Sequence, residues 1–209
     1  MNVSNRTGVR VAYAAAAANL LAALGMLLVL RPGLPAGDPV LGRRVLYVLS
    51  HLAAWRAGWL VWHLAALLLL ALFVVLFLRW KEAAPLAAPL ALICAAAGLA
   101  ADVSAEGMFM VPAVGSGTAH LEGLAVLLTG YVGNGLYTVA GILLTWAGRR
   151  DLPALLLYVA VPVWVAGLWL AAATLGGSTT GQVLSTSVLM PMFVLWAFLV
   201  GRWLSASES

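Results

Sequence analysis

Six long apolar segments constrain the fold of this 209-residue chain more than any other feature of its sequence. A hydrocarbon core about 30 Å thick is spanned by about 20 apolar residues, because a helix rises about 1.5 Å per residue. We therefore expect an all-α polytopic membrane protein with six transmembrane helices in a single domain, 1–209. The six predicted spans are residues 9–30, 52–78, 85–110, 118–146, 153–175 and 181–204.

Composition excludes a water-soluble surface. The chain is 64% hydrophobic and only 9% charged, whereas soluble domains carry about 25% charged residues. The lipid bilayer is thus its main partner. A net charge of +4 without any basic run gives no support for nucleic-acid binding. The sequence leaves open whether the protein forms a homo-oligomer.

A short amphipathic helix is expected before the second span. Asp38 is the predicted N-cap and Pro39 the first helical residue. Leu41, Val45 and Val48 recur at helical spacing, with Arg43, Arg44 and Tyr47 on another face. That pattern is typical of a helix lying in the membrane interface.

The basic residues orient the chain. With a cytoplasmic N-terminus, the inner side carries seven of the eleven Lys and Arg residues and the outer side carries four. The inner set is Arg6, Arg10, Arg79, Lys81, Arg149, Arg150 and Arg202; the outer set is Arg31, Arg43, Arg44 and Arg56. We expect an inner (plasma) membrane with both termini cytoplasmic, and Trp55, Trp59 and Trp62 at the outer interface.

Polar residues gather in the outer third of the predicted membrane. From the helical rise, His63 lies about 24 Å and Arg56 about 35 Å above the inner edge, while Asp102 and Glu106 lie at about 26 and 32 Å. His120 and Glu122 begin the fourth span on the same side. Ionisable residues within membrane segments are costly, which makes them candidates for function.

Helical spacing groups these candidates on two faces. Arg56, Trp59 and His63 share one face of the second span, and Asp102 and Glu106 share one face of the third. We expect Arg56 to pair with Glu106 and His63 with Asp102, since charges buried in lipid need partners. Singly and jointly substituted Arg56 and Glu106 would then show coupled effects.

The functional interpretation is an outward-facing polar pocket that binds or moves a small molecule or a lipid. Arg56 would hold an anionic group, with His63 and Asp102 as a protonatable pair. One alternative is a membrane-embedded enzyme acting on a lipid or isoprenoid, in which Asp102, Glu106 and His63 do acid–base work or bind metal. Another is a structural subunit of a membrane complex, in which the charges only join helices. For His120 and Glu122 the helix-start interpretation is the simpler one.

No cofactor or metal is predicted. The sequence lacks His-x-x-x-His, Glu-x-x-His and His-Glu-x-x-His, and its three histidines are scattered. Nucleophilic catalysis lacks support as well, because no Gly-x-Ser-x-Gly occurs. The catalytic residues, if the chain is an enzyme, stay unassigned.

The fourth span carries a stripe of small and polar residues. Its members are Gly123, Gly130, Asn134, Tyr137 and Gly141. Glycines allow close helix approach, and Asn134 is expected to hydrogen-bond to another helix near mid-membrane. We interpret the stripe as packing, with a pocket lining as the alternative. Pro162 and Pro191 are expected to kink the fifth and sixth spans.

Several short motifs follow one another in a recognisable order. Gly37-Asp38 follows the first span, Arg56-Ala-Gly-Trp-Leu opens the second, and Gly130-Tyr-Val-Gly-Asn lies in the fourth. Arg149-Arg-Asp-Leu-Pro precedes the fifth. In this order the chain resembles a bacterial family of six-helix integral membrane proteins of unknown function. The resemblance covers most of the chain and implies its topology and a bacterial inner membrane. It carries over no functional residue.

Overall fold

The structure, a computed structural model, describes residues 5–111 and 118–207, and this part of the chain folds almost wholly into helices. Six helical stretches are long and apolar enough to cross a membrane, which confirms the all-α, six-span prediction. Helices suit this sequence because their backbone groups are hydrogen-bonded within the segment, where lipid offers no partner. The spans are Arg6–Gly33, Leu52–Trp80, Ala87–Met110, His120–Ala147, Ala154–Leu175 and Thr179–Ala206.

Two of the six spans change their helical pitch. The first consists of α1 (Asn5–Gly25), a π-helical turn η1 (Met26–Leu30) and a 3₁₀ turn η2 (Arg31–Gly33). The fourth consists of α5 (Thr118–Val126), a π-helical segment η3 (Leu127–Gly133) and α6 (Asn134–Ala147). The other four spans are single α-helices: α3 (Leu52–Trp80), α4 (Ala87–Met110), α7 (Ala154–Leu175) and α8 (Thr179–Ala206).

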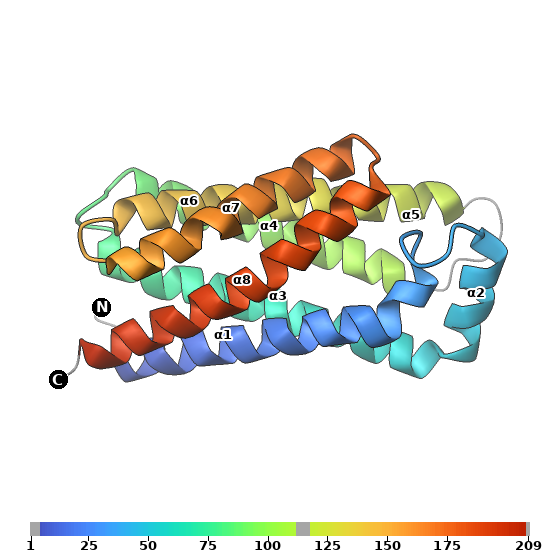
Figure 1. Cartoon of the computed structure of the whole chain (residues 1–209), viewed down its shortest axis with the longest axis horizontal. Helices are drawn as coiled ribbons and strands as arrows, with labels where there is room; N and C mark the ends of the chain where they lie inside the picture. The colour runs from blue at the N-terminus through green and yellow to red at the C-terminus, as the bar shows by residue number, and fades with distance from the viewer. Residues whose placement is uncertain (1–4, 112–117, 208–209) are drawn as a thin grey trace.

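The spans form a closed bundle. α3 packs against α1 and α4, α4 against η3 and α6, and α7 against α6 and α8. α8 then packs on α1, which closes the ring, and crosses the face of the bundle diagonally (Figure 1). Both ends of the chain lie at the same end of the bundle, as six crossings require (Figure 1).

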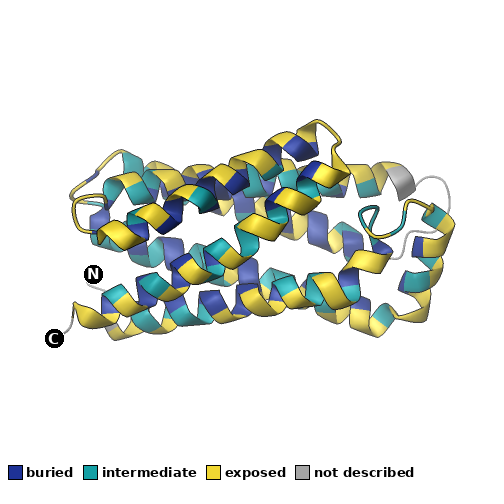
Figure 2. Cartoon of the chain, in the orientation of Figure 1, coloured by how far each residue is buried: buried dark blue, intermediate teal, exposed yellow. Residues whose placement is uncertain are grey.

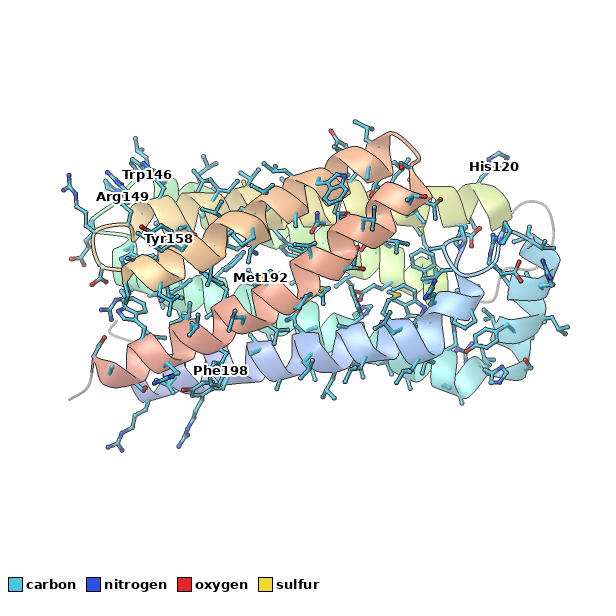
Figure 3. All side chains as sticks on the ribbon, viewed as in Figure 1. His120, Trp146, Arg149, Tyr158, Met192 and Phe198 are labelled. Atoms are coloured by element: carbon cyan, nitrogen blue, oxygen red, sulfur yellow. The ribbon has the colours of Figure 1, made fainter. Side chains whose placement is uncertain are left out.

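The exterior of the bundle is apolar. Leu28, Leu86 and Tyr158 are 76%, 86% and 75% exposed, and exposed residues run along the outward sides of the helices (Figure 2). Tyr158 projects away from the bundle (Figure 3). A continuous apolar surface is unfavourable in contact with water and favourable in contact with lipid tails.

The half of the bundle that bears the termini is a tightly packed aromatic and aliphatic core. The Trp164 ring on α7 meets Trp196 of α8 edge-on, with ring centroids 5.3 Å apart. Gly141 leaves room for Trp164, because a Cβ at this glycine would collide with the indole ring. The glycine thus serves packing, as the stripe on the fourth span predicted.

A hydrogen-bonded turn joins α7 to α8. Gly177 has a φ of 66°, a left-handed conformation that favours glycine. Its N–H donates to Thr174 O and the Ser178 N–H donates to Ala173 O, which closes the end of α7. The Ser178 hydroxyl then accepts the Gly181 N–H and starts α8. Both helices continue through their prolines, Pro162 and Pro191.

The short helix α2 (Leu41–Ser50) lies across the end opposite the termini (Figure 1). It starts two residues later than predicted from Asp38 and Pro39, because the Asp38 carboxylate accepts the Val40 N–H and pairs with Arg43 instead of capping the helix. The polar face also differs from the prediction. Arg44 is only 7% exposed and points into the bundle, since Glu122 there provides an ionic partner.

At the end of the bundle that bears the termini, an ion pair joins the second span to the loop before α7. Arg79 Nε lies 2.8 Å from Asp151 Oδ2, and the Trp80 indole N–H donates to the same oxygen. The hydrogen bond from Arg79 lowers the pKa of the Asp151 carboxyl below its ordinary value. Trp146 and Arg149 project outward at this end (Figure 3), with the guanidinium over the indole.

Candidate functional site

Two carboxyl groups lie inside the bundle on one face of α4. Asp102 is 4% exposed and Glu106 is 0% exposed. They are about one helical turn apart, so both side chains project in the same direction. The small residues Gly98 and Ala105 on the same side of α4 are buried too, which lets the neighbouring helices approach the acids closely. The sequence correctly placed the pair on one buried face.

The imidazole of His63 on α3 is the partner of Glu106. Its Nδ1 forms a close ion pair with Glu106 Oε2, and the same nitrogen lies 3.3 Å from the Trp59 carbonyl oxygen. A carbonyl oxygen only accepts, so a hydrogen bond from the ring to Trp59 O requires a hydrogen on Nδ1. The His63 side chain is 22% exposed, which leaves this ring accessible while Glu106 is not.

The predicted pairings of Arg56 with Glu106 and of His63 with Asp102 are therefore wrong. Arg56 is exposed, and its Nε lies 3.4 Å from the carbonyl oxygen of Met110 at the C-terminal end of α4. The reason is the depth at which α3 and α4 meet. Arg56 lies about two turns beyond His63, which is too far out to reach Glu106.

Asp102 is held by the fourth span instead. The Thr129 hydroxyl in η3 donates a short hydrogen bond to Asp102 Oδ1. The Tyr137 ring of α6 packs against Gly98, where a Cβ would stand 3.1 Å from Cδ1 of the ring. Its hydroxyl faces Asp102 without reaching hydrogen-bond geometry. The sequence stripe included Tyr137 as a packing residue, and Thr129 was missed because nothing in the sequence indicates a π-helical turn.

The π-helical segment η3 brings the fourth span close to the acids. A Cβ on Gly133 would stand 3.4 Å from Asp102 Cβ and 3.3 Å from Gly98 O. A Cβ on Gly130, on another side of η3, would meet Thr174 of α7. Asn134 Nδ2 donates to Gly167 O of α7 at 2.8 Å, which confirms its predicted bond to another helix. π-Helical turns are frequent at functional sites.

An aromatic layer joins α3 to the last turn of α4, at the end of the bundle opposite the termini. Trp59 stacks on Phe109 with centroids 4.6 Å apart and planes at 4°, and meets Trp55 edge-on. Trp55 Nε1 donates to Phe109 O at 2.6 Å. Trp55 and Trp59 are 3% and 2% exposed, so their side chains pack within the protein and do not face lipid. They are buried because α4 supplies an aromatic partner and a free carbonyl oxygen at its last turn.

A cavity lies at the same end of the bundle. Its empty volume is about 580 Å³, counting the space open at its mouth, and its wall is mostly apolar. Trp55 and Phe109 line it, and Arg44 and Glu122 form the ion pair in its wall, with Nη2 and Oε2 2.6 Å apart. Glu122 is thus paired with α2, outside the cluster. His120 is exposed and points away from the bundle (Figure 3).

The cluster contains two acidic groups and one imidazole. If both carboxyls ionised, a protonated imidazole would balance only one of them, and no Lys or Arg within the described residues forms an ion pair with either acid. Glu106 Oε1 and the Tyr137 hydroxyl are buried and lack hydrogen-bond partners in this part of the chain. An unbalanced charge is very costly at such a depth, so the cluster is suited to take up a proton or another cation.

Transition-metal chemistry finds no support in the arrangement of these side chains. Within residues 5–111 and 118–207, no group of three or more His, Cys, Asp and Glu side chains is placed to hold a metal ion. Comparison with known proteins adds no further constraint, since no family model, curated protein or solved structure matches this chain.

Proposed function

We propose that this multi-pass membrane protein binds or moves a small molecule or a lipid from the outer side of the membrane, and that the His63–Glu106 pair exchanges a proton in the process. One observation carries the proposal: Glu106 is a fully buried carboxyl whose one ionic partner in the described chain is a histidine. A histidine changes charge near neutral pH, so the pair can switch between two charge states.

The surroundings of the pair support a coupled role. Phe109 lines the cavity and stacks on Trp59, and the backbone oxygen of Trp59 lies 3.3 Å from His63 Nδ1. A ligand that changes the packing of the stack would also change the access of water to the pair. Asp102 adds a second carboxyl one turn deeper.

The membrane and the orientation are part of the proposal. Seven of the eleven basic residues belong to the end that bears the termini, which favours a cytoplasmic location for that end. The resemblance to a bacterial six-helix family supports the inner membrane of a bacterium. The cavity and the aromatic layer would then face the periplasmic or external side.

Infrared difference spectroscopy of purified protein during a pH titration tests the proton exchange. Six of the seven acidic side chains remain in Glu106→Gln and titrate there as well. We therefore expect the wild type to show, on acidification, one component of the carbonyl stretch of protonated carboxylic acids that is missing in Glu106→Gln. Glu122→Gln is the matched control, because Glu122 lies outside the cluster, and it should keep this component. A wild-type spectrum identical to that of Glu106→Gln at every pH would contradict the proposal.

A further inference from the structure

Four oxygen-bearing side chains from two spans meet around the buried acids. Asp102 and Glu106 come from α4, Thr129 from η3, and Tyr137 from α6. Thr129 is hydrogen-bonded to Asp102, and the Tyr137 hydroxyl faces the same carboxyl. Oxygen ligands of this type are the ones that hard cations prefer.

Two atoms of this group are buried without a partner. Glu106 Oε1 and the Tyr137 hydroxyl oxygen have no hydrogen bond within the described chain, and their residues are 0% and 9% exposed. Tyr137 belongs to a different span from the acids, so it is independent of the carboxyl pair. A buried polar atom without a partner costs about 1–3 kcal/mol. A bound cation would offset this cost at both atoms.

The backbone beside the acids is also unusual. η3 is π-helical where it faces Asp102, and the Leu128 and Gly98 carbonyl oxygens both lie beside Gly133. Irregular backbone at membrane depth is tolerated where it is buried in protein, and in membrane transporters such segments contribute carbonyl ligands to Na⁺ or H⁺ sites.

We infer that Asp102, Glu106, Thr129 and Tyr137 form a binding site for a monovalent hard cation, with Na⁺ as the ion. A single positive charge matches the site, because Glu106 is paired with His63 and Asp102 has no ionic partner among the described residues. This inference rests on the ion-handling role proposed above and names a second ion for the same cluster. Na⁺ and a proton then compete, because each neutralises the same carboxyl pair.

Thermal unfolding of the purified full-length protein in NaCl, compared with choline chloride at equal ionic strength, tests the site. A ligand that binds only the folded state raises the melting temperature in a concentration-dependent way. We expect a saturable rise in NaCl for the wild type and none in choline chloride.

Three variants locate the effect. Asp102→Asn and Glu106→Gln keep the side-chain shapes and should abolish the NaCl-dependent rise, whereas Glu122→Gln should retain it. Tyr137→Phe keeps the ring against Gly98 and removes only the hydroxyl, so it should weaken Na⁺ binding even if the carboxamide variants fold poorly. Equal melting of the wild type in both salts overturns the inference, as does a full rise in Asp102→Asn or Tyr137→Phe. If the infrared band of Glu106 titrates while NaCl has no effect, the proton proposal stands and the sodium site falls.

Discussion

The carboxyl of Glu106 on α4 and the imidazole of His63 on α3 form an ion pair in which the acid is wholly buried and the histidine is 22% exposed. The two members of the pair therefore differ in their access to the surroundings. The Glu106 carboxylate, which needs a positive partner, is shielded, whereas the His63 imidazole, which can supply the positive charge, is partly exposed. Protonation of His63 therefore controls the charge that Glu106 experiences.

The ion pair predicts energetic coupling between the two residues. His63→Leu should destabilise the fold by about 3–5 kcal/mol, because it leaves Glu106 buried without its cation. His63→Leu combined with Glu106→Leu should cost at least 1 kcal/mol less than the sum of the two single changes. Unfolding free energies measured in mixed micelles give the cycle. The control cycle of Arg56→Leu with Glu106→Leu should be additive, and coupling of similar size there would restore the pairing with Arg56.

The stack of Trp59 on Phe109 predicts a large packing cost at the end of the bundle opposite the termini. Trp59→Ala should lower the free energy of unfolding by about 3–5 kcal/mol, as for other buried aromatic residues. Trp146 is 53% exposed and serves as the matched control. Its replacement by alanine should change stability much less, by about 0.5 kcal/mol. Equal losses for the two variants would show that Trp59 does not pack as the structure has it.

Gly141 predicts a steric effect in the opposite half of the bundle. Gly141→Ala places a Cβ against the indole of Trp164 and should cost about 1–3 kcal/mol through overpacking. At Gly107 nothing lies within 4 Å of the added Cβ. Gly107→Ala should therefore be neutral or stabilise α4 by up to about 1 kcal/mol, the difference in helix propensity. Melting temperatures of the two purified variants provide the comparison.

The ion pair between Arg44 and Glu122 predicts how α2 is attached to the bundle. Glu122→Gln weakens this contact, so amide hydrogen exchange in α2 should become faster than in the wild type. Arg43→Ala is the control, because the Arg43 side chain is 67% exposed and its partner Asp38 is in the same segment. Exchange rates in α2 that are identical in Glu122→Gln and the wild type would mean that apolar contacts alone hold this helix.

The lowered pKa of Asp151 predicts a small pH effect. A carboxyl whose folded pKa is depressed stabilises the fold above its ordinary pKa, and this contribution is lost as the pH falls towards the folded pKa. Asp151→Asn should therefore be less stable than the wild type at neutral pH, by about 1 kcal/mol or less for a partly exposed pair. The difference should shrink in acid, below the ordinary Asp range near pH 4. A difference that grows in acid would contradict this sign.

The sequence alone determined the six spans, because a continuous run of about 20 apolar residues has few alternatives to a membrane-spanning helix. It also placed Asp102 and Glu106 on one buried face, since helical periodicity decides which residues project together. The tertiary structure decided the partners. His63 rather than Arg56 reaches Glu106 because the depth at which α3 and α4 meet is set by packing, which periodicity does not encode. Thr129 contacts Asp102 because η3 has a π-helical pitch. Trp59 is buried because Phe109 of α4 stacks on it.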